Sequence, residues 1–381
     1  MIFTTAILAD VHFGAVSSKQ LYQELKDQFL EFIKDRYLDM IVIAGDFFNS
    51  VISLNSKTSM RAFRFMDELV GLCKRNNIRY IRIIEGTLSH DNFQIENFSV
   101  FESDPDLDFR VITKICDEVL DGLRILYVPE EYIENPMEYY KPYFDRGKKY
   151  YNMIFGHGMF KETSFTNDDG ENIISQAPIL DSKVIGTICR GPVFFGHIHT
   201  SQVIRKHIYY VGSFSRWVYG QEEPKGFYVS VYDTDTDRYA VEFIENTMAR
   251  RYDTLKVHLD YYDKPIESLI NVAKTLKVDN LRIQVLIEGS EKDFSAMLAM
   301  LKEYYTGKAG YKLDIVDKRE KLRQEKTEEK VNKILTEYNF VFDNSIPVDV
   351  KIHKFIKRKH SKDVSDEIIR NVLNLDTNKH T

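Results

Sequence analysis

Five of the ten histidines in this sequence follow a short apolar run, and two aspartates occupy equivalent positions. Asp10 and His12 end the first apolar run, and Asp46 ends the second, directly after Gly45. The five histidines are His12, His90, His157, His197 and His199. Carboxylate and imidazole groups together suit divalent ions such as Mn, Fe and Zn. One such triplet is weak evidence, but its recurrence predicts a two-metal centre that could clamp a phosphoryl group.

The segments that precede these residues alternate between the patterns of strands and helices. Apolar, β-branched runs at 2–9, 38–48 and 79–84 predict buried strands. Between them, apolar residues recur at helical spacing over 19–37 and 59–76, which predicts two amphipathic helices. This order is typical of a layered α/β sheet, in which ligands collect beyond the carboxyl ends of the strands. The candidate ligands therefore fall at one edge of the predicted sheet.

A second run of shorter strands follows. We expect these strands at 122–128, 151–157, 191–196, 209–214, 226–232 and 239–244. Two of them end in Gly-His pairs, at His157 and His197. We expect the whole run to form the other half of a two-sheet sandwich.

Length and composition limit the organisation of the chain. At 381 residues it exceeds one typical domain, and 43% hydrophobic residues suffice for a core. We expect a first domain at 1–248, a small α+β unit at 249–316, and a charged linker with helices at 317–381. The small unit is expected to contain strands at 254–259, 280–287 and 311–316 and helices near 265–276 and 291–305.

Other features narrow the class of protein. The three cysteines are widely spaced, which indicates reduced thiols in a cytoplasmic protein. No apolar stretch approaches the roughly 20 residues of a membrane span, and the amino terminus has no pattern of a secretory signal. The net charge of −6 argues against a non-specific nucleic-acid binder. It is compatible with a DNA enzyme whose positive charge is local or supplied by metals.

Five short motifs resemble those of the calcineurin-like metallophosphoesterases. They are Asp10-x-His12, Gly45-Asp46, Gly86 to His90-Asp91, Gly156-His157 and Gly196-His197-x-His199. Within that superfamily, segments 8–14, 211–213 and 224–227 resemble the SbcD-type double-strand-break repair nucleases, including related phage recombination subunits. The resemblance is dense over residues 1–230. It implies a four-layered α/β/β/α sandwich with a small capping domain and a helical carboxyl-terminal tail.

The resemblance implies a metal-binding role for six residues at the strand ends. The first ion would be bound by Asp10, His12 and His199, the second by His157 and His197, and Asp46 would bridge both. The implied cofactors are two divalent ions, Mn²⁺ in the first place and Mg²⁺ as the alternative.

The third motif carries the implied catalytic residues and departs from the family. His90 would protonate the leaving oxygen or stabilise charge on the phosphate, and Asp91 stands beside it in the same motif. The family usually has Gly-Asn-His-Asp or Gly-Asn-His-Glu, in which Asn binds the second metal. Here 86–92 reads Gly-Thr-Leu-Ser-His-Asp-Asn, which is two residues longer. We predict Ser89 as the replacement ligand, with the Asn92 amide and a water molecule as alternatives.

The implied function is that of a manganese-dependent DNA nuclease, a 3'-5' exonuclease and/or endonuclease. It would act on double-stranded DNA ends in double-strand-break repair or recombination, together with an SbcC-type coiled-coil ATPase. The chain has no Gly-x-x-x-x-Gly-Lys-Ser/Thr loop, so any ATP use would belong to that partner. A homodimer is also expected, through helices near 55–75 and 90–105. We expect the protein in the cytoplasm, or in the host cytoplasm if a phage encodes it.

Two further segments are candidates for binding. Arg216 and Trp217, the only tryptophan, could contact DNA, and core packing is the alternative for Trp217. Segment 351–362 is strongly basic and could contact phosphates, although a solvated helix face is the simpler interpretation. Its cations include Lys354, Lys357 and Arg358. The apolar residues between them favour a stripe that binds a protein partner.

Two other functions compete with the nuclease. A small-molecule phosphodiesterase or phosphatase would share the same site, but it needs neither a cap nor a basic tail. A metal-poor scaffold with a phosphoesterase fold is favoured only by the altered third motif. Measured metal content would separate the scaffold from the enzymes, and activity on a chromogenic diester or on duplex DNA ends would separate the two enzymes.

Overall fold

The computed structural model describes residues 1–163, 179–257, 280–285, 312–317 and 346–360, together with residues 299, 340, 365 and 368. The chain divides into two compact units, and the first of them contains residues 1–254. The candidate metal-binding residues all lie in this first unit. The domain boundaries expected at 248 and 316 stay predictions.

Six strands form the first sheet, in the order β14-β13-β1-β2-β3-β4. Their bounds are β1 (Ile2–Leu8), β2 (Met40–Ala44), β3 (Tyr80–Ile84), β4 (Asp108–Ile112), β13 (Gly226–Asp233) and β14 (Arg238–Glu245). Strands β1 to β4 are parallel to one another, and β13 runs antiparallel to β1. Central parallel strands are buried on both faces, which explains why β2 is apolar throughout. The strands predicted at 2–9, 38–48 and 79–84 are confirmed as β1, β2 and β3.

The second sheet also has six strands, in the order β11-β12-β10-β7-β6-β5. Their bounds are β5 (Cys116–Leu120), β6 (Leu123–Val128), β7 (Met153–His157), β10 (Val193–Gly196), β11 (Gln202–Arg205) and β12 (Ile208–Tyr210). The placement of 226–232 and 239–244 in this sheet was wrong, because these segments form β13 and β14 of the first sheet. Alternation of apolar residues shows which face of a strand is buried, but it does not show which strand it pairs with.

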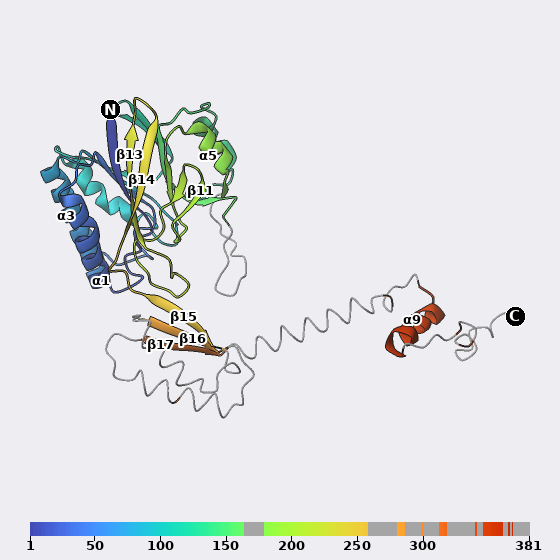
Figure 1. The fold of residues 1–381 in the computed structure, drawn as a ribbon. Helices are drawn as coiled ribbons and strands as arrows, with labels where there is room; N and C mark the ends of the chain where they lie inside the picture. Colours follow the sequence, from blue (N-terminus) through green and yellow to red (C-terminus); the bar gives the residue numbers. More distant parts are fainter. Residues whose placement is uncertain are drawn as a thin grey trace. The chain divides into compact units, whose positions relative to one another are not determined.

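Helices cover the outer faces of the two sheets, as Figure 1 shows with α1 and α3 on one side and α5 on the other. Over the first sheet lie α1 (Ser18–Glu24), the π-helical turn η1 (Leu25–Leu30), α2 (Glu31–Lys34), α3 (Lys57–Asn76) and the 3₁₀ segment η2 (Gln94–Ser103). Over the second lie α4 (Pro136–Phe144) and α5 (Ser182–Ile188). The two helices predicted at 19–37 and 59–76 are confirmed, although the first includes a π-helical turn.

Three apolar clusters separate these layers. One lies between the helices and the first sheet and includes Leu25, Phe65 and Ile43. A second fills the space between the two sheets, where Phe3 and Met40 lie in the same cluster as Phe155 and Phe194. The third lies between the second sheet and α4 and α5. The predicted α/β/β/α sandwich is therefore confirmed.

The remaining described elements are short. Strands β8 (Met159–Phe160) and β9 (Ile179–Leu180) pair with each other, and a three-stranded sheet contains β15 (Tyr252–Val257), β16 (Asn280–Val285) and β17 (Lys312–Asp317). Helix α9 spans Val348–His360. Apart from residue 299, the helices predicted near 265–276 and 291–305 lie outside the described residues. Within the described part of the chain, no helix is both long enough and apolar enough to cross a membrane.

Candidate metal centre

The predicted ligands lie where parallel strands of the two sheets end. Asp10 and His12 follow β1, Asp46 follows β2, His157 is the last residue of β7, and His197 follows β10. Four of these residues have left-handed backbone conformations, with φ of 46°, 52°, 49° and 97° for Asp10, His12, Asp46 and His197. Non-glycine residues with such angles persist only where the surrounding structure holds them, and they cluster at functional sites.

Four side chains form a first group, namely Asp10, His12, Asp46 and His199, and their ligand atoms lie within 4.8 Å of one another. The Nε2 atoms of His12 and His199 are 3.2 Å apart, and His12 Nε2 is 3.7 Å from Asp46 Oδ2. Asp10 Oδ2 is buried and has no hydrogen-bond partner among the described residues. An unpartnered carboxylate oxygen beside converging imidazole nitrogens fits a bound cation.

Burial controls the ionisation of this first group. It raises the pKa of Asp10 to about 6 and lowers the pKa of His12 to about 3. It also lowers the pKa of His199 well below its ordinary value. Both imidazoles are therefore neutral near pH 7, and the neutral imidazole is the form that binds a metal. A cation bound here would supply the positive charge that stabilises the ionised form of Asp10.

A second group contains His157, His197 and Glu130. Glu130 Oε2 lies 2.7 Å from His197 Nδ1 and 3.6 Å from His157 Nε2. Glu130 is only 4% exposed and lies two residues beyond β6, at the same edge as the other candidate ligands. Glu130 was not among the predicted ligands. The sequence feature that could have identified it is an acidic residue just past the strand predicted at 122–128.

Asp46 belongs to the first group and also faces the second. Its Oδ2 atom is 3.7 Å from His12 Nε2 in the first group and 3.4 Å from His157 Nε2 in the second. Burial alone would raise the pKa of Asp46, but the positive charge of a protonated His157 and its hydrogen bond to Asp46 outweigh burial and lower the pKa below its ordinary value. Asp46 Oδ1 accepts the backbone N–H of Thr87 at 2.6 Å. One ionised oxygen therefore faces both groups, which is the geometry of a bridging ligand.

Close backbone approach at this point requires glycine. A Cβ atom on Gly86 would lie 2.3 Å from Asp46 Oδ1, and one on Gly45 would lie 2.1 Å from His157 Nδ1. Gly45 also has a φ of 80°, which side-chain-bearing residues rarely adopt. The Gly45-Asp46 pair and Gly86 therefore let the loops after β2 and β3 meet over the centre.

Thr87 places a hydroxyl against the second group, in the same loop as both residues predicted to replace the family's Asn. Its Oγ1 atom is 3.3 Å from Asp46 Oδ2, 3.4 Å from Glu130 Oε2, 3.4 Å from His197 Nδ1 and 3.5 Å from His157 Nε2. Ser89 and Asn92 are exposed. The backbone turns between Thr87 and His90, where the His90 N–H donates to the Thr87 carbonyl. The extra residues of the loop therefore lie after the hydroxyl that faces the centre.

His90 lies beside the first group without belonging to it. Its Nδ1 is 2.6 Å from the Asn49 carbonyl oxygen, to which Nδ1–H can donate. The His90 ring meets the His12 ring edge to face, with centroids 4.7 Å apart. A backbone acceptor on Nδ1 fixes the ring and leaves Nε2 for proton transfer.

Asp91, predicted beside His90 as a catalytic residue, connects two loops. Its Oδ1 accepts the N–H of Phe48 at 2.8 Å, and its Oδ2 accepts the N–H of Gly86 at 2.9 Å. The side chain is fully buried, and burial raises the pKa of Asp91 well above its ordinary value. Both oxygens contact backbone amides, so the geometry of Asp91 is that of a positioning residue.

The other ring nitrogens of two candidate ligands also have partners. His157 Nδ1 is 2.9 Å from the Ala44 carbonyl oxygen, to which Nδ1–H donates, and Nε2 faces Asp46. His199 Nδ1 is 2.9 Å from Gln221 Nε2, while Gln221 Oε1 has no partner among the described residues. Turning the Gln221 amide over would satisfy that oxygen and hold the proton on Nδ1. Such outer partners orient imidazole ligands.

Arg216 and Trp217 differ in their placement. Trp217 is half-buried, and its ring centroid is 4.5 Å from that of His12 and 4.9 Å from that of His199. Arg216 is buried and donates to backbone carbonyl oxygens, including that of Glu223 at 2.6 Å. Trp217 therefore covers the first group, whereas Arg216 holds together the backbone that carries Trp217.

The basic residues predicted at the carboxyl-terminal end lie in α9, in the second compact unit. Lys354 and Lys357 are exposed, and Lys354 Nζ is 5.9 Å from the ring centroid of Phe340. The side chain of Arg358 lies outside the described residues. Contact of this helix with DNA or with a partner stays a prediction.

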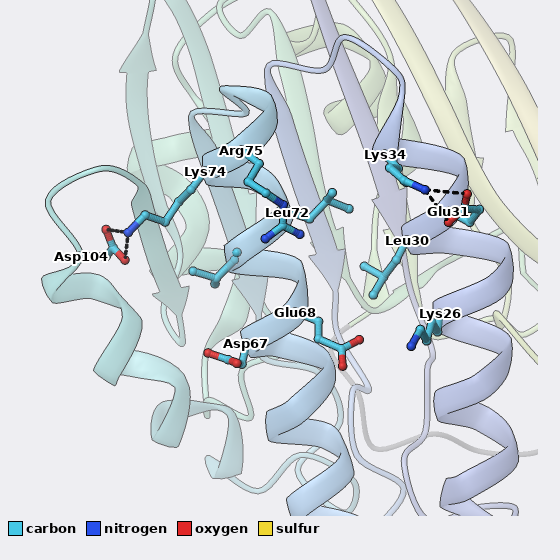
Figure 2. Close-up of a pocket in the computed structure, with 12 residues that line it drawn as sticks. Lys26, Leu30, Glu31, Lys34, Asp67, Glu68, Leu72, Lys74, Arg75 and Asp104 are labelled. Carbon is cyan, nitrogen blue, oxygen red and sulfur yellow. Dashed lines mark hydrogen bonds and ion pairs between the residues drawn. The ribbon is translucent and has the colours of Figure 1, made fainter.

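A separate cleft of about 540 Å³ lies between the helices that cover the first sheet (Figure 2). Acidic and basic side chains line it and pair locally, as in the ion pairs of Lys74 with Asp104 at 2.9 Å and Lys34 with Glu31 at 3.1 Å. None of the residues of the two metal-binding groups lines it. The strand ends, and not this cleft, therefore hold the candidate chemistry.

No family model matches the sequence, and no curated protein matches it. Solved structures with similar folds include a dimetal phosphatase from Danio rerio (TM-score 0.38, 9% identity, 64% of this chain and 96% of that one). They also include an archaeal phosphodiesterase, with a TM-score of 0.32 and 10% identity over 63% of this chain and 99% of that one. Nuclease MPE of Pseudomonas putida has a TM-score of 0.23 and 17% identity over 54% of this chain and 66% of that one. These TM-scores are too low to support an inference about activity, which we therefore draw from the side chains of the centre.

Proposed function

We propose that this chain hydrolyses phosphodiesters at a centre of two divalent metal ions, in the manner of the calcineurin-like metallophosphoesterases. The observation that carries the proposal is the position of Asp46 Oδ2, which faces imidazole nitrogens of both groups. The donor set of carboxylates and imidazoles suits Mn²⁺, Fe²⁺ or Zn²⁺. The unpartnered, buried Asp10 Oδ2 supports a cation in the first group.

Each residue of the centre has a separate role in this proposal. Asp10, His12 and His199 would hold one ion, Glu130, His157 and His197 the other, with Asp46 shared and Thr87 beside the second. Bound there, the two ions would supply Lewis acidity at the phosphate and lower the pKa of the attacking water. His90, whose Nδ1 proton is held by the Asn49 carbonyl, would carry a second proton on Nε2 and donate it to the leaving oxygen. Trp217 would exclude water from one side of the first ion.

We further propose that the diester is DNA, cleaved from double-stranded ends by exonuclease or endonuclease action with Mn²⁺ as the preferred ion. The support is the density of SbcD-type motifs over residues 1–230. A homodimer and an SbcC-type coiled-coil ATPase complete this proposal. Helix α9, with its exposed Lys354 and Lys357 beside apolar residues, is the segment that we propose for that partner.

The alternatives make different predictions from the same centre. A small-molecule phosphodiesterase would need no DNA-specific surface, and a scaffold would need no intact donor set. The buried, unpartnered Oδ2 of Asp10 disfavours a scaffold, because a buried acceptor without a donor or cation destabilises the fold.

The test is digestion of linear duplex DNA by the full chain with and without MnCl₂, alongside hydrolysis of bis(p-nitrophenyl) phosphate. Manganese-dependent DNA degradation that is lost in Asp46→Ala and His90→Ala would support the nuclease. Hydrolysis of the small diester without DNA degradation would favour the small-molecule enzyme. Loss of neither activity in Asp46→Ala would contradict the proposed centre.

A further inference from the structure

A cavity of about 230 Å³ opens next to the second metal-binding group, between the loop after β3 and the segment after β6. Glu130, a candidate ligand of the second ion, forms part of its wall. This volume accommodates a group of the size of one heterocyclic base. A group bound here would lie directly beside a phosphate held at the centre.

Apolar side chains form the outer wall of this cavity. Leu88, Phe93 and Tyr132 line it and are 42%, 51% and 40% exposed. Large apolar side chains that stay this exposed around a polar site are typical of a surface that a ligand covers. The Tyr132 O–H donates to Glu130, so the aromatic wall is attached to the second group. Phe93 and Tyr132 are aromatic side chains, the type on which bases stack in nucleic-acid-binding sites.

A buried acid forms the polar part of the cavity. Glu85 lines it and is only 4% exposed. Its Oε1 accepts the backbone N–H of Phe93 at 2.6 Å, whereas its Oε2 has no partner among the described residues. A buried acceptor without a donor is destabilising unless a ligand or solvent completes it. A ligand that donates to Oε2 and covers the aromatic wall would complete this acceptor.

The sign of the charge excludes a phosphate from this cavity. Three acids line it, Glu85, Glu130 and Glu131, against the single cation Lys114. A carboxylate acceptor beside aromatic side chains instead suits a base with an exocyclic amino group, such as the N4 amine of cytosine. Uracil and thymine have a carbonyl oxygen at that position, which an acid repels.

We propose that this cavity is the subsite for the base of the nucleotide whose phosphate is cleaved, and that Glu85 gives it a preference for amino-bearing bases. The proposal rests on the proposed phosphodiesterase function, since the phosphate at the metal centre anchors the base in the cavity. It assigns a specificity role to Glu85 and Phe93, neither of which belongs to the metal-binding groups.

Isothermal titration calorimetry of the Mn²⁺-loaded full chain at pH 8 tests the subsite with three probes: dCMP, dUMP and 2-deoxyribose 5-phosphate. The wild type should bind dCMP about tenfold more tightly than dUMP, the difference of one hydrogen bond. Both nucleotides should bind more tightly than the sugar phosphate. Glu85→Gln should abolish or reverse the preference between the nucleotides, because the amide donates to the O4 oxygen of uracil.

Two further variants distinguish a local effect on the cavity from a general loss of structure. Phe93→Ala should weaken both nucleotides by about tenfold through lost stacking, with the sugar phosphate unchanged. Glu134→Gln, an exposed glutamate of the same segment that does not line the cavity, should match the wild type. Equal affinity of the wild type for all three probes would overturn the subsite, as would a cytosine preference that survives in Glu85→Gln.

Diester hydrolysis measured on the same preparation separates this proposal from the proposed function. Hydrolysis of bis(p-nitrophenyl) phosphate without discrimination among the three probes would overturn the subsite alone. Discrimination without hydrolysis of any diester would support the subsite and overturn the enzyme.

Discussion

The two halves of the metal centre differ in how their residues are positioned. In the first half, Asp10 and His12 leave β1 directly, and their left-handed backbone conformations point both side chains at the same place. In the second half, Glu130 and Thr87 come from loops after β6 and β3. The first half therefore depends mainly on the end of β1, whereas the second combines His157 and His197 at strand ends with two residues from loops.

The largest effect on activity and metal binding is expected from substitution of Asp46, which both halves share. Asp46→Ala should remove both ions, because its Oδ2 faces both groups. The loss of diester hydrolysis should therefore exceed the roughly 10²–10⁴-fold that one general acid contributes. Metal analysis of the dialysed protein by mass spectrometry should show both ions lost. Retention of one tightly bound ion would show that Asp46 serves a single half.

Removal of the proposed acid should leave both halves intact. His90→Ala should lower the rate by about 10²–10⁴-fold without changing the number of bound ions, since His90 belongs to neither group. The loss should be smaller for a nitrophenyl ester, whose leaving group needs no proton, than for DNA. An equal loss on both substrates would contradict the role of His90 as the acid.

Glu130→Ala separates the two halves. It should weaken binding of the second ion by at least the 10–100-fold that loss of an outer partner typically causes, with the first ion retained. The matched control is Glu131→Ala, because Glu131 directs its oxygens at the Ile115 N–H and the Tyr139 O–H. Identical metal binding by the two variants would remove Glu130 from the centre.

Asp91→Ala tests whether Asp91 holds together the loops after β2 and β3. It leaves the N–H groups of Phe48 and Gly86 without a buried acceptor, which should lower the free energy of unfolding by about 1–3 kcal/mol for each. Urea denaturation measures this change. Asp106→Ala, at an exposed ion pair, should be close to neutral. An Asp91→Ala protein as stable as the wild type would refute the positioning role.

The smallest effect is expected at Thr87. A neutral hydroxyl within 3.5 Å of four candidate ligands contributes at most about tenfold to affinity for the second ion. Thr87→Val keeps the shape and removes the oxygen, and calorimetric titration with Mn²⁺ should detect the change. Ser89→Ala is the control and should have no effect. The opposite order of effects would restore Ser89 as the ligand.

The sequence predicted the strand-end residues because their positions follow from the strands alone. An apolar run fixes where a parallel strand ends, and Gly-His or Gly-Asp pairs mark the turn that follows. Thr87 could not be predicted in the same way. Counting back from His90 gives Ser89, but the loop turns between Thr87 and His90, and only its folded path brings Thr87 to the centre.

The pairing of strands in the two sheets was also beyond prediction from local sequence patterns. Apolar patterns located most strands, but they placed 226–232 and 239–244 in the second sheet. The structure instead pairs β13 with β1, with Ala6 opposite Val229. Pairing of strands far apart in sequence depends on which edge is free once the core has packed, and a local pattern does not contain that information.

Electron paramagnetic resonance of the Mn²⁺-titrated wild type tests the central claim most directly, because it counts ions and detects coupling between them without requiring turnover. A centre that shares Asp46 predicts two equivalents of bound Mn²⁺ per chain and the spectrum of an exchange-coupled pair. The coupled spectrum should vanish in Glu130→Ala while one equivalent remains. Two uncoupled ions, or a single bound ion in the wild type, would contradict the shared centre.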